Sequence, residues 1–295
     1  MTDSAVIPVP ALPLSPAPPP VSAPPGGWDV PLRGPMWPAF RALLRRDFVV
    51  LDKNLKEFLF GTIIQPLLLI FTLTWVFPTI GQGVGGNPAA SARFSTLVCA
   101  GVVAQTIFFQ AIWRVALPMV RELEVTNELE DRISTLPVAL VALEKVAFGA
   151  LQSLLAALIV FPIAAFVPAT PVYLRANWPV LLTVVPLACL TAGAMGLTVG
   201  TLFHPRSLAY LSSAITLPLA FLGAIFYTWD SLSPAPWLKV AVLVNPLVYM
   251  SEGLRGALVT GVPHMPLAAV YAALGASSIG LTLFGVRRFR SRVLL

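Results

Sequence analysis

Charge is the scarcest property of this sequence. Only 11% of the residues are Asp, Glu, Lys or Arg, whereas 57% are hydrophobic and the mean hydropathy is +0.83. A soluble domain carries about 25% charged residues. A single soluble core of 295 residues could not bury this much apolar surface. The composition therefore excludes an ordinary soluble protein and indicates a chain that folds in lipid.

Side chains that carry chemistry are also scarce. Both cysteines, Cys99 and Cys189, lie inside apolar runs, which disfavours a disulfide framework. The two histidines, His204 and His264, are predicted on opposite sides of the membrane and could not share a metal. No lysine follows a glycine, so the phosphate loop of an ATPase is absent, as are the zinc-protease and serine-hydrolase motifs. The sequence therefore predicts neither an enzyme nor a metal site.

Six segments are long and apolar enough to cross a bilayer, which takes about 20 residues. They are residues 59–80, 94–118, 141–167, 180–203, 207–229 and 267–286. No Asp or Glu lies in the middle of any of them. Ion-coupled transporters usually bind their ion with a carboxylate inside the membrane, so this class is disfavoured.

The basic residues predict the orientation of these spans. With six spans, fourteen basic residues fall on the side of the two termini: Arg33, Arg41, Arg45, Arg46, Lys53, Lys56, Arg121, Arg132, Lys145, Arg206, Arg287, Arg288, Arg290 and Arg292. The opposite side has four: Arg93, Arg175, Lys239 and Arg255. Arg114 lies in the last two turns of the second span and can extend toward the surface. Because basic residues collect in the cytoplasm, both termini are predicted there.

Two segments precede the first span. Residues 1–35 contain eleven prolines, which block helix formation, and they predict a disordered cytoplasmic tail. Residues 36–58 have a different pattern, with charges between apolar residues at steps of three and four. That pattern predicts an amphipathic helix lying on the cytoplasmic membrane surface. Its apolar positions are Trp37, Phe40, Leu44, Phe48, Leu51, Leu55 and Phe58.

A further apolar stretch, WLKVAVLVNPLVYM, lies between spans five and six. It is too short to cross the bilayer and contains Lys239, Asn245 and Pro246, so a re-entrant external segment is predicted over residues 234–256. Glu252 and Arg255 are spaced to pair on a helix, which contributes modestly if the pair is exposed. An outer gate and a purely structural role remain open for this segment.

Polar groups are concentrated at two other places. The loop 121–140 holds five of the thirteen carboxylates, and its apolar positions recur at helical spacing, which predicts a short amphipathic helix over 126–136. It could dock on a partner or be a solvated loop. Inside the spans, Gln65, Gln105 and Gln110 could line a substrate path or hydrogen-bond between helices. Gly196 and Gly200, four apart, favour close packing of helices, within the chain or, as the alternative, at a dimer seam.

Two stretches resemble the permeases of type-2 ABC exporters. VTNELEDRISTLPVAL, residues 125–140, has the charged stretch, leucine-rich turn and proline that this family has before its third span. FYTWDSLSPAPWLKVAVLVNPLVYMSEGLR, residues 226–255, is similar to the family's segment between spans five and six, with its proline-rich turn, Asn-Pro-Leu and Glu-x-x-Arg. The resemblance extends over residues 37–290 and leaves out the Pro-rich tail.

The resemblance implies roles for three groups of residues. The helix at 126–136 would be the coupling helix that contacts an ATPase, through Glu128, Leu129, Glu130, Asp131, Arg132, Ile133 and Leu136. The helix at 36–58 would be the connecting helix, with Arg41, Arg45, Phe48 and Lys53. The outer gate would involve Asn245, Pro246, Tyr249, Glu252 and Arg255. The expected fold is an all-α membrane protein with six transmembrane helices, this connecting helix and a re-entrant external hairpin.

The resemblance also implies a complex in the bacterial plasma membrane. Two permease subunits, identical or similar, would sit over two separately encoded ATPase subunits, which would bind ATP and magnesium. This chain would bind no cofactor and no nucleic acid. Its cargo would be an amphipathic drug or lipid-like molecule leaving the cytoplasm or inner leaflet, or alternatively a polysaccharide or lipid-linked glycan. An ion-coupled transporter or channel without an ATPase is the alternative from another class.

Overall fold

The computed structural model describes residues 36–81, 88–124, 136–168, 172, 174–203, 216–259 and 262–293. The Pro-rich tail and most of the predicted coupling helix lie outside this part of the chain. Regular structure within the described ranges is helical, and the β-type pairing found there is an isolated bridge between Leu174 and Val259. With the apolar composition, this confirms the prediction of an all-α membrane protein.

The described helices are, in chain order, α1 (Met36–Lys53), α2 (Leu55–Phe71), the π-helical η1 (Thr72–Val76), α3 (Phe77–Thr79), α4 (Pro88–Glu124), α6 (Val138–Phe166), α7 (Trp178–Leu202), α9 (Thr216–Phe221), the 3₁₀ turn η2 (Trp229–Leu232), α10 (Pro236–Ala241), the 3₁₀ turn η3 (Val242–Val244), α11 (Pro246–Leu258) and α12 (Leu267–Val293).

Five stretches of helix in the described part of the chain are long and apolar enough to cross a membrane. They are Leu55–Thr79, Ala89–Arg121, Val138–Phe166, Trp178–Leu202 and Leu267–Arg292, and they coincide with five of the predicted segments. The remaining predicted span, 207–229, begins outside the described residues and is described from Thr216 onward. In its described portion the helix α9 ends at Phe221, and the backbone turns at Leu222.

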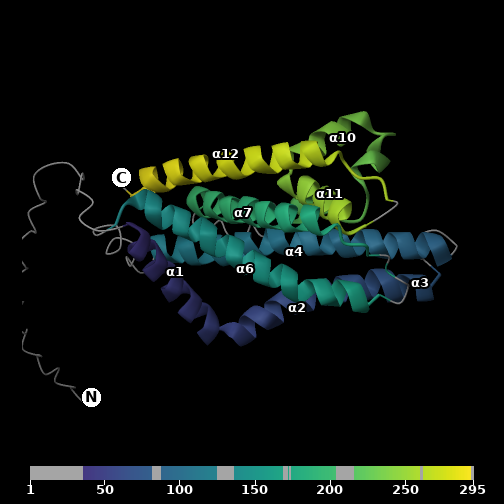
Figure 1. Ribbon diagram of the computed structural model, residues 1–295, viewed down its shortest axis with the longest axis horizontal. Helices are drawn as coiled ribbons and strands as arrows, with labels where there is room; N and C mark the ends of the chain where they lie inside the picture. Colours follow the sequence, from purple (N-terminus) through teal and green to yellow (C-terminus); the bar gives the residue numbers. More distant parts are fainter. Residues whose placement is uncertain are drawn as a thin grey trace, which may run out of the picture. The chain divides into compact units, whose positions relative to one another are not determined.

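The predicted helix over residues 36–58 is divided in two. α1 ends at Lys53, Asn54 is a turn residue, and α2 continues from Leu55 into the first apolar span. The Asn54 side chain donates to the carbonyl of Val50 at 3.0 Å, so it satisfies a carbonyl at the end of α1. The resulting angle between α1 and α2 is plain in Figure 1. Periodicity alone did not reveal the break because the apolar positions keep their spacing through Asn54.

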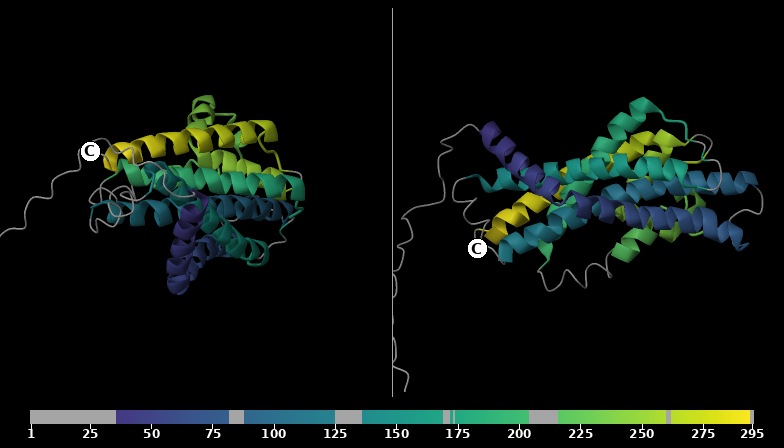
Figure 2. Two further views of the ribbon diagram at one scale, coloured as in Figure 1. Left: turned by 60° about the vertical axis from the view of Figure 1, so that its left-hand side comes forward. Right: turned by 90° about the horizontal axis from the view of Figure 1, so that it is seen from below.

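The core forms where α4 packs along α6 and α7, and where α7 packs along α12 (Figures 1 and 2). Gly196 of α7 lies against α4: a Cβ added there would be 2.6 Å from the carbonyl oxygen of Ala111. A Cβ added at Gly200 would be 3.1 Å from Cα of Ala116, also in α4. In lipid, helices associate largely through such close van der Waals contact. These two glycines therefore serve packing within the chain, as their spacing predicted.

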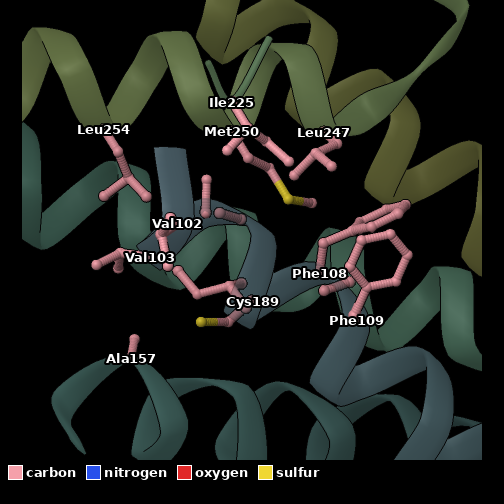
Figure 3. Close-up of a cluster of buried hydrophobic side chains, with 14 of the residues drawn as sticks. Val102, Val103, Phe108, Phe109, Ala157, Cys189, Ile225, Leu247, Met250 and Leu254 are labelled. Atoms are coloured by element: carbon pink, nitrogen blue, oxygen red, sulfur yellow. The ribbon is translucent and has the colours of Figure 1, made fainter. Parts of the chain in front are cut away.

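The short helix α11 completes this core. Figure 3 shows Leu247, Met250 and Leu254 of α11 directed toward side chains of α4, among them Val102 and Phe108. All three α11 side chains are fully buried. Because α11 is anchored in the core, the segment around it is a fixed part of the fold.

Candidate functional site

A cavity of about 300 Å³ with a mixed lining of apolar and polar residues lies between α2 and α4. It brings together all three glutamines that the sequence placed inside the spans. Its lining residues are Gly61, Thr62, Gln65, Pro66 and Leu69 of α2, and Gln105, Thr106, Phe109, Gln110, Trp113, Arg114 and Leu117 of α4. On each helix the lining positions are neighbouring pairs that recur every four residues, so each helix turns one face toward the cavity.

The three glutamines do different things. Gln110 donates from Nε2 to Thr62 Oγ1 at 2.9 Å, which joins α4 to α2. Gln105 presents a buried Oε1 with no hydrogen-bond partner in the described part of the chain. Gln65 is exposed and makes no hydrogen bond there. Gln110 thus serves helix contact, whereas Gln65 and Gln105 leave polar groups available to a ligand or to water.

Arg114 lies at the same cavity, although its position near a span end suggested only extension toward the surface. Its guanidinium carbon is 5.4 Å from the centre of the Phe58 ring, a cation–π contact between α4 and α2. Its Nη2 lies 3.4 Å from the Glu57 carbonyl oxygen, a long hydrogen bond. The contact with α2 places a positive charge on the cavity wall.

The predicted outer-gate residues form a second cluster, centred on a salt bridge between Glu252 and Arg255. The two side chains are 2.8 Å apart and both are 0% exposed. Arg255 donates to the carbonyl oxygens of Ala224 and Ile225. Since these carbonyls belong to the turn that follows α9, the arginine fastens that turn to α11. The modest contribution expected of an exposed pair does not apply here.

Glu252 completes the cluster as an acceptor. It accepts the backbone N–H of Trp229 at 2.9 Å and that of Met265 at 2.8 Å. Trp229 precedes α10 and Met265 precedes α12, so one carboxylate fixes the connections on both sides of α11. Two side chains thereby satisfy four backbone groups from three segments, in a region where unpaired polar groups are costly.

Asn245, Pro246 and Tyr249 set the start of α11. Asn245 accepts the N–H of Leu247 at 3.0 Å, as an N-cap residue does, and donates to the carbonyl of Leu219 at 2.8 Å. Pro246 occupies the first helical position, where its missing N–H costs nothing. Tyr249 donates to the carbonyl of Leu243 at 2.9 Å. The five predicted residues thus belong to one cross-linked unit, and a gating role for it stays a prediction.

The predicted connecting-helix residues differ in how far they are buried. Arg41, Arg45 and Lys53 are exposed. Phe48 is half-buried, and its ring meets that of Phe148 of α6 edge to face at 5.5 Å. The aromatic contact therefore joins α1 to α6, and the three basic residues lie on the outside of α1.

The stronger link between these helices was not predicted. Asp47 of α1 is buried, and its Oδ2 lies 3.1 Å from Nζ of Lys145 in α6. Its Oδ1 accepts from Arg46 Nη2 at 2.7 Å. Burial alone would raise the pKa of Asp47, but the charges and hydrogen bonds of Lys145 and Arg46 hold it below its ordinary value of 3.8. A lysine at the start of an apolar span was the one available signal for this ion pair.

The predicted coupling residues Glu128, Leu129, Glu130, Asp131, Arg132 and Ile133 lie outside the described residues. Leu136 is described, half-buried, and packs against a cluster that includes Met119, Val141 and Phe289. Pro137 is extended, with φ −60° and ψ 131°, and α6 begins directly after it. The end of the loop is therefore joined to α6 without an intervening linker.

Comparison with known proteins covers most of this arrangement, but not α12. Residues 38–259 match the model of the family described as ABC-2 type transporter. No curated protein matches the chain. The matched range includes the cavity, the buried Glu252–Arg255 pair and most of α1.

Proposed function

The chain belongs to the ABC-2 type transporter family, and from this premise we propose that it exports an amphipathic drug or lipid-like molecule with energy supplied by a separate ATPase. It is a membrane permease subunit of the family. Two such subunits, identical or paired with a similar chain, would work with two ATPase subunits that bind ATP and magnesium. The complex would lie in the bacterial plasma membrane, with both termini of this chain in the cytoplasm.

The cavity between α2 and α4 is the observation that carries this proposal. It combines amide groups from Gln65 and Gln105 with the aromatic rings of Phe109 and Trp113. Ligand sites are mostly apolar with a few placed polar groups, and this lining suits a molecule with both kinds of surface. A glutamine exposed on a membrane helix is costly in lipid, so Gln65 favours a cavity closed by substrate, water or a second permease subunit.

The structure also supports a route by which an ATPase could act on the permease. The loop at 121–140 leads through Leu136 and Pro137 directly into α6. Lys145 and Phe148 of α6 hold Asp47 and Phe48 of α1. A push on the loop would thus move α6 and α1 together. In this proposal the loop is the coupling element and α1 the connecting helix.

The proposal can be tested with the purified complex. The chain is expressed with the ATPase encoded beside its gene, purified by a tag on the permease alone, and assayed for ATP hydrolysis and for transport in proteoliposomes. We expect the ATPase to co-purify and hydrolyse ATP. A correctly inserted permease to which no ATPase binds would refute the proposal.

The coupling loop offers a sharper test. Ile133→Asp or Leu129→Asp should abolish transport, because a buried charge cannot sit in an apolar docking groove, while the permease stays folded in the membrane. Ser134→Asp, which adds the same charge outside the apolar stripe, is the matched control. Normal transport by a correctly inserted Ile133→Asp variant would contradict the coupling role.

A further inference from the structure

The cavity between α2 and α4 has a formal charge of +1. Arg114 supplies it, and no Asp, Glu or Lys is among the residues that line the cavity. Gln105 adds a buried oxygen without a hydrogen-bond partner among the described residues. A cation in surroundings this apolar requires either water or an opposite charge.

The two buried cations in the described part of the chain have that opposite charge, whereas Arg114 is half-buried. Lys145 lies 3.1 Å from Asp47, and Arg255 lies 2.8 Å from Glu252. Arg114 differs, because within the described ranges no carboxylate oxygen lies within salt-bridge distance of it. Glu57 acts on it electrostatically from the exposed start of α2.

The hydrogen-bonding capacity of Arg114 is also largely unused. Its guanidinium has five N–H donors, of which one is directed at the Glu57 carbonyl, at the long distance of 3.4 Å. The cation–π contact with Phe58 uses no N–H donor, and no other hydrogen bond of this guanidinium is found among the described residues. A planar fork with free edge donors fits a phosphate, sulfate or carboxylate through two parallel hydrogen bonds.

We propose that the cavity recognises an amphipathic anion, whose charged headgroup binds Arg114 and whose apolar part lies against Leu69, Phe109 and Leu117. This inference rests on the proposed export function and narrows its substrate class. Binding neutralises the cavity, because the ligand supplies the carboxylate or phosphate that this arginine lacks. The Nε2 groups of Gln65 and Gln105 can donate to the headgroup, whereas Oε1 of Gln105 is an acceptor and needs a hydroxyl or water. The aromatic rings cover the first part of the chain.

The test compares amphiphiles that differ only in their headgroup. The probes are a nitroxide-labelled alkyl sulfate, the phosphate and the carboxylate of the same chain, the neutral alcohol, and the trimethylammonium cation. Binding to the purified permease–ATPase complex is followed by the immobilised fraction of the nitroxide spectrum. The nitroxide quenches nearby tryptophans. The part of the quenching that is lost in Trp113→Phe comes from Trp113 and places the bound probe at the cavity.

We expect the three anions to bind at least about tenfold more tightly than the alcohol, since hydrogen bonds to charged groups contribute on this scale. Arg114→Gln should remove that preference, and Arg114→Lys should retain part of it. Arg93→Gln is the matched control: it removes an arginine from the exposed surface of the same helix and should leave the preference intact. Comparing the three anions identifies the preferred headgroup.

Three outcomes would overturn the inference: equal binding of sulfate and alcohol, a preference that survives Arg114→Gln, or no saturable binding of any probe. ATP hydrolysis measured on the same preparations separates these from failure of the export function. A complex that hydrolyses ATP but does not distinguish the headgroups refutes the anion site alone. An ATPase that never associates refutes the exporter, whatever the probes show.

Discussion

Two buried ion pairs among the described residues stabilise different kinds of structure. Glu252 and Arg255 are 0% exposed and lie three residues apart on α11, where they bind backbone groups of the flanking segments. Asp47 and Lys145 are 98 residues apart and join one helix to another through side chains. The first pair therefore fixes the path of the chain, whereas the second fixes the position of a whole helix and can separate without unfolding any backbone.

The largest expected effect follows from removing one partner of the α11 pair. Arg255→Met should lower the free energy of unfolding by about 3–5 kcal/mol, because it leaves Glu252 charged and buried without compensation. The measurement is the fraction of monodisperse protein after heating in detergent. Lys239→Met is the control, since its partner Asp230 is 65% exposed and such a pair contributes at most about 1 kcal/mol. Equal losses for the two variants would contradict the distinction.

Double substitutions sharpen the comparison. Replacing both members of the α1–α6 pair, as Asp47→Leu with Lys145→Met, should recover most of the stability that Lys145→Met alone removes, because apolar packing can replace an ion pair. The double variant Glu252→Leu with Arg255→Met should recover little. It leaves the N–H groups of Trp229 and Met265 and two carbonyls unpaired. The measurement is the thermal stability of the single and double variants. Full recovery of stability in the Glu252→Leu, Arg255→Met double variant would refute this account.

The α1–α6 pair should matter more for transport than for stability. Lys145→Met is expected to lower transport several-fold while ATP hydrolysis by the complex continues, because α1 is no longer held to the helix that follows the coupling loop. The two rates are measured on the same proteoliposomes. Arg41→Met, an exposed change on α1, is the control. Parallel loss of both activities in Lys145→Met would indicate a folding defect instead.

The smallest effect concerns pH. The pKa of Asp47 is lowered in the folded state, so this group contributes stability above its unfolded value of 3.8 and loses the contribution as pH falls through the folded value. The stability difference between the protein and Asp47→Asn should thus be constant from about pH 5 to 8 and shrink below about pH 4. Thermal unfolding across this range measures it. A difference that already changes near pH 6 would show that the pKa is not depressed.

Much of the fold could be predicted because lipid imposes a simple pattern. Apolar runs of about 20 residues mark the spans, and Pro137 and Pro246 mark helix starts at which their rings are tolerated. The prediction was weaker at Asn54, where the apolar positions keep their helical spacing, and at Leu222, which lies inside an apolar run. A break of this kind depends on which neighbour satisfies the freed carbonyl groups, and that is a tertiary property.

The sites were predicted in part for the same reason. Gln65, Gln105 and Gln110 were recognisable as polar groups in apolar helices, and helical periodicity constrains which of them share a face. Asp47 was not recognisable, because in sequence it resembles Asp52, an exposed neighbour on the same helix. Only its contact with Lys145 distinguishes it.

Composition and periodicity determined that this chain is an all-α membrane protein, since the cost of exposing backbone groups to lipid leaves helices as the stable choice for such apolar segments. Tertiary structure alone decided which charges are paired. The spacing of Glu252 and Arg255 allowed a pair, yet their burial depends on segments that pack over α11 from both sides. Arg114 is half-buried, and its contact with Phe58 of α2 places it on the cavity wall. An ionic interaction depends on distance and on exclusion of water, and both are set by residues far away in the sequence.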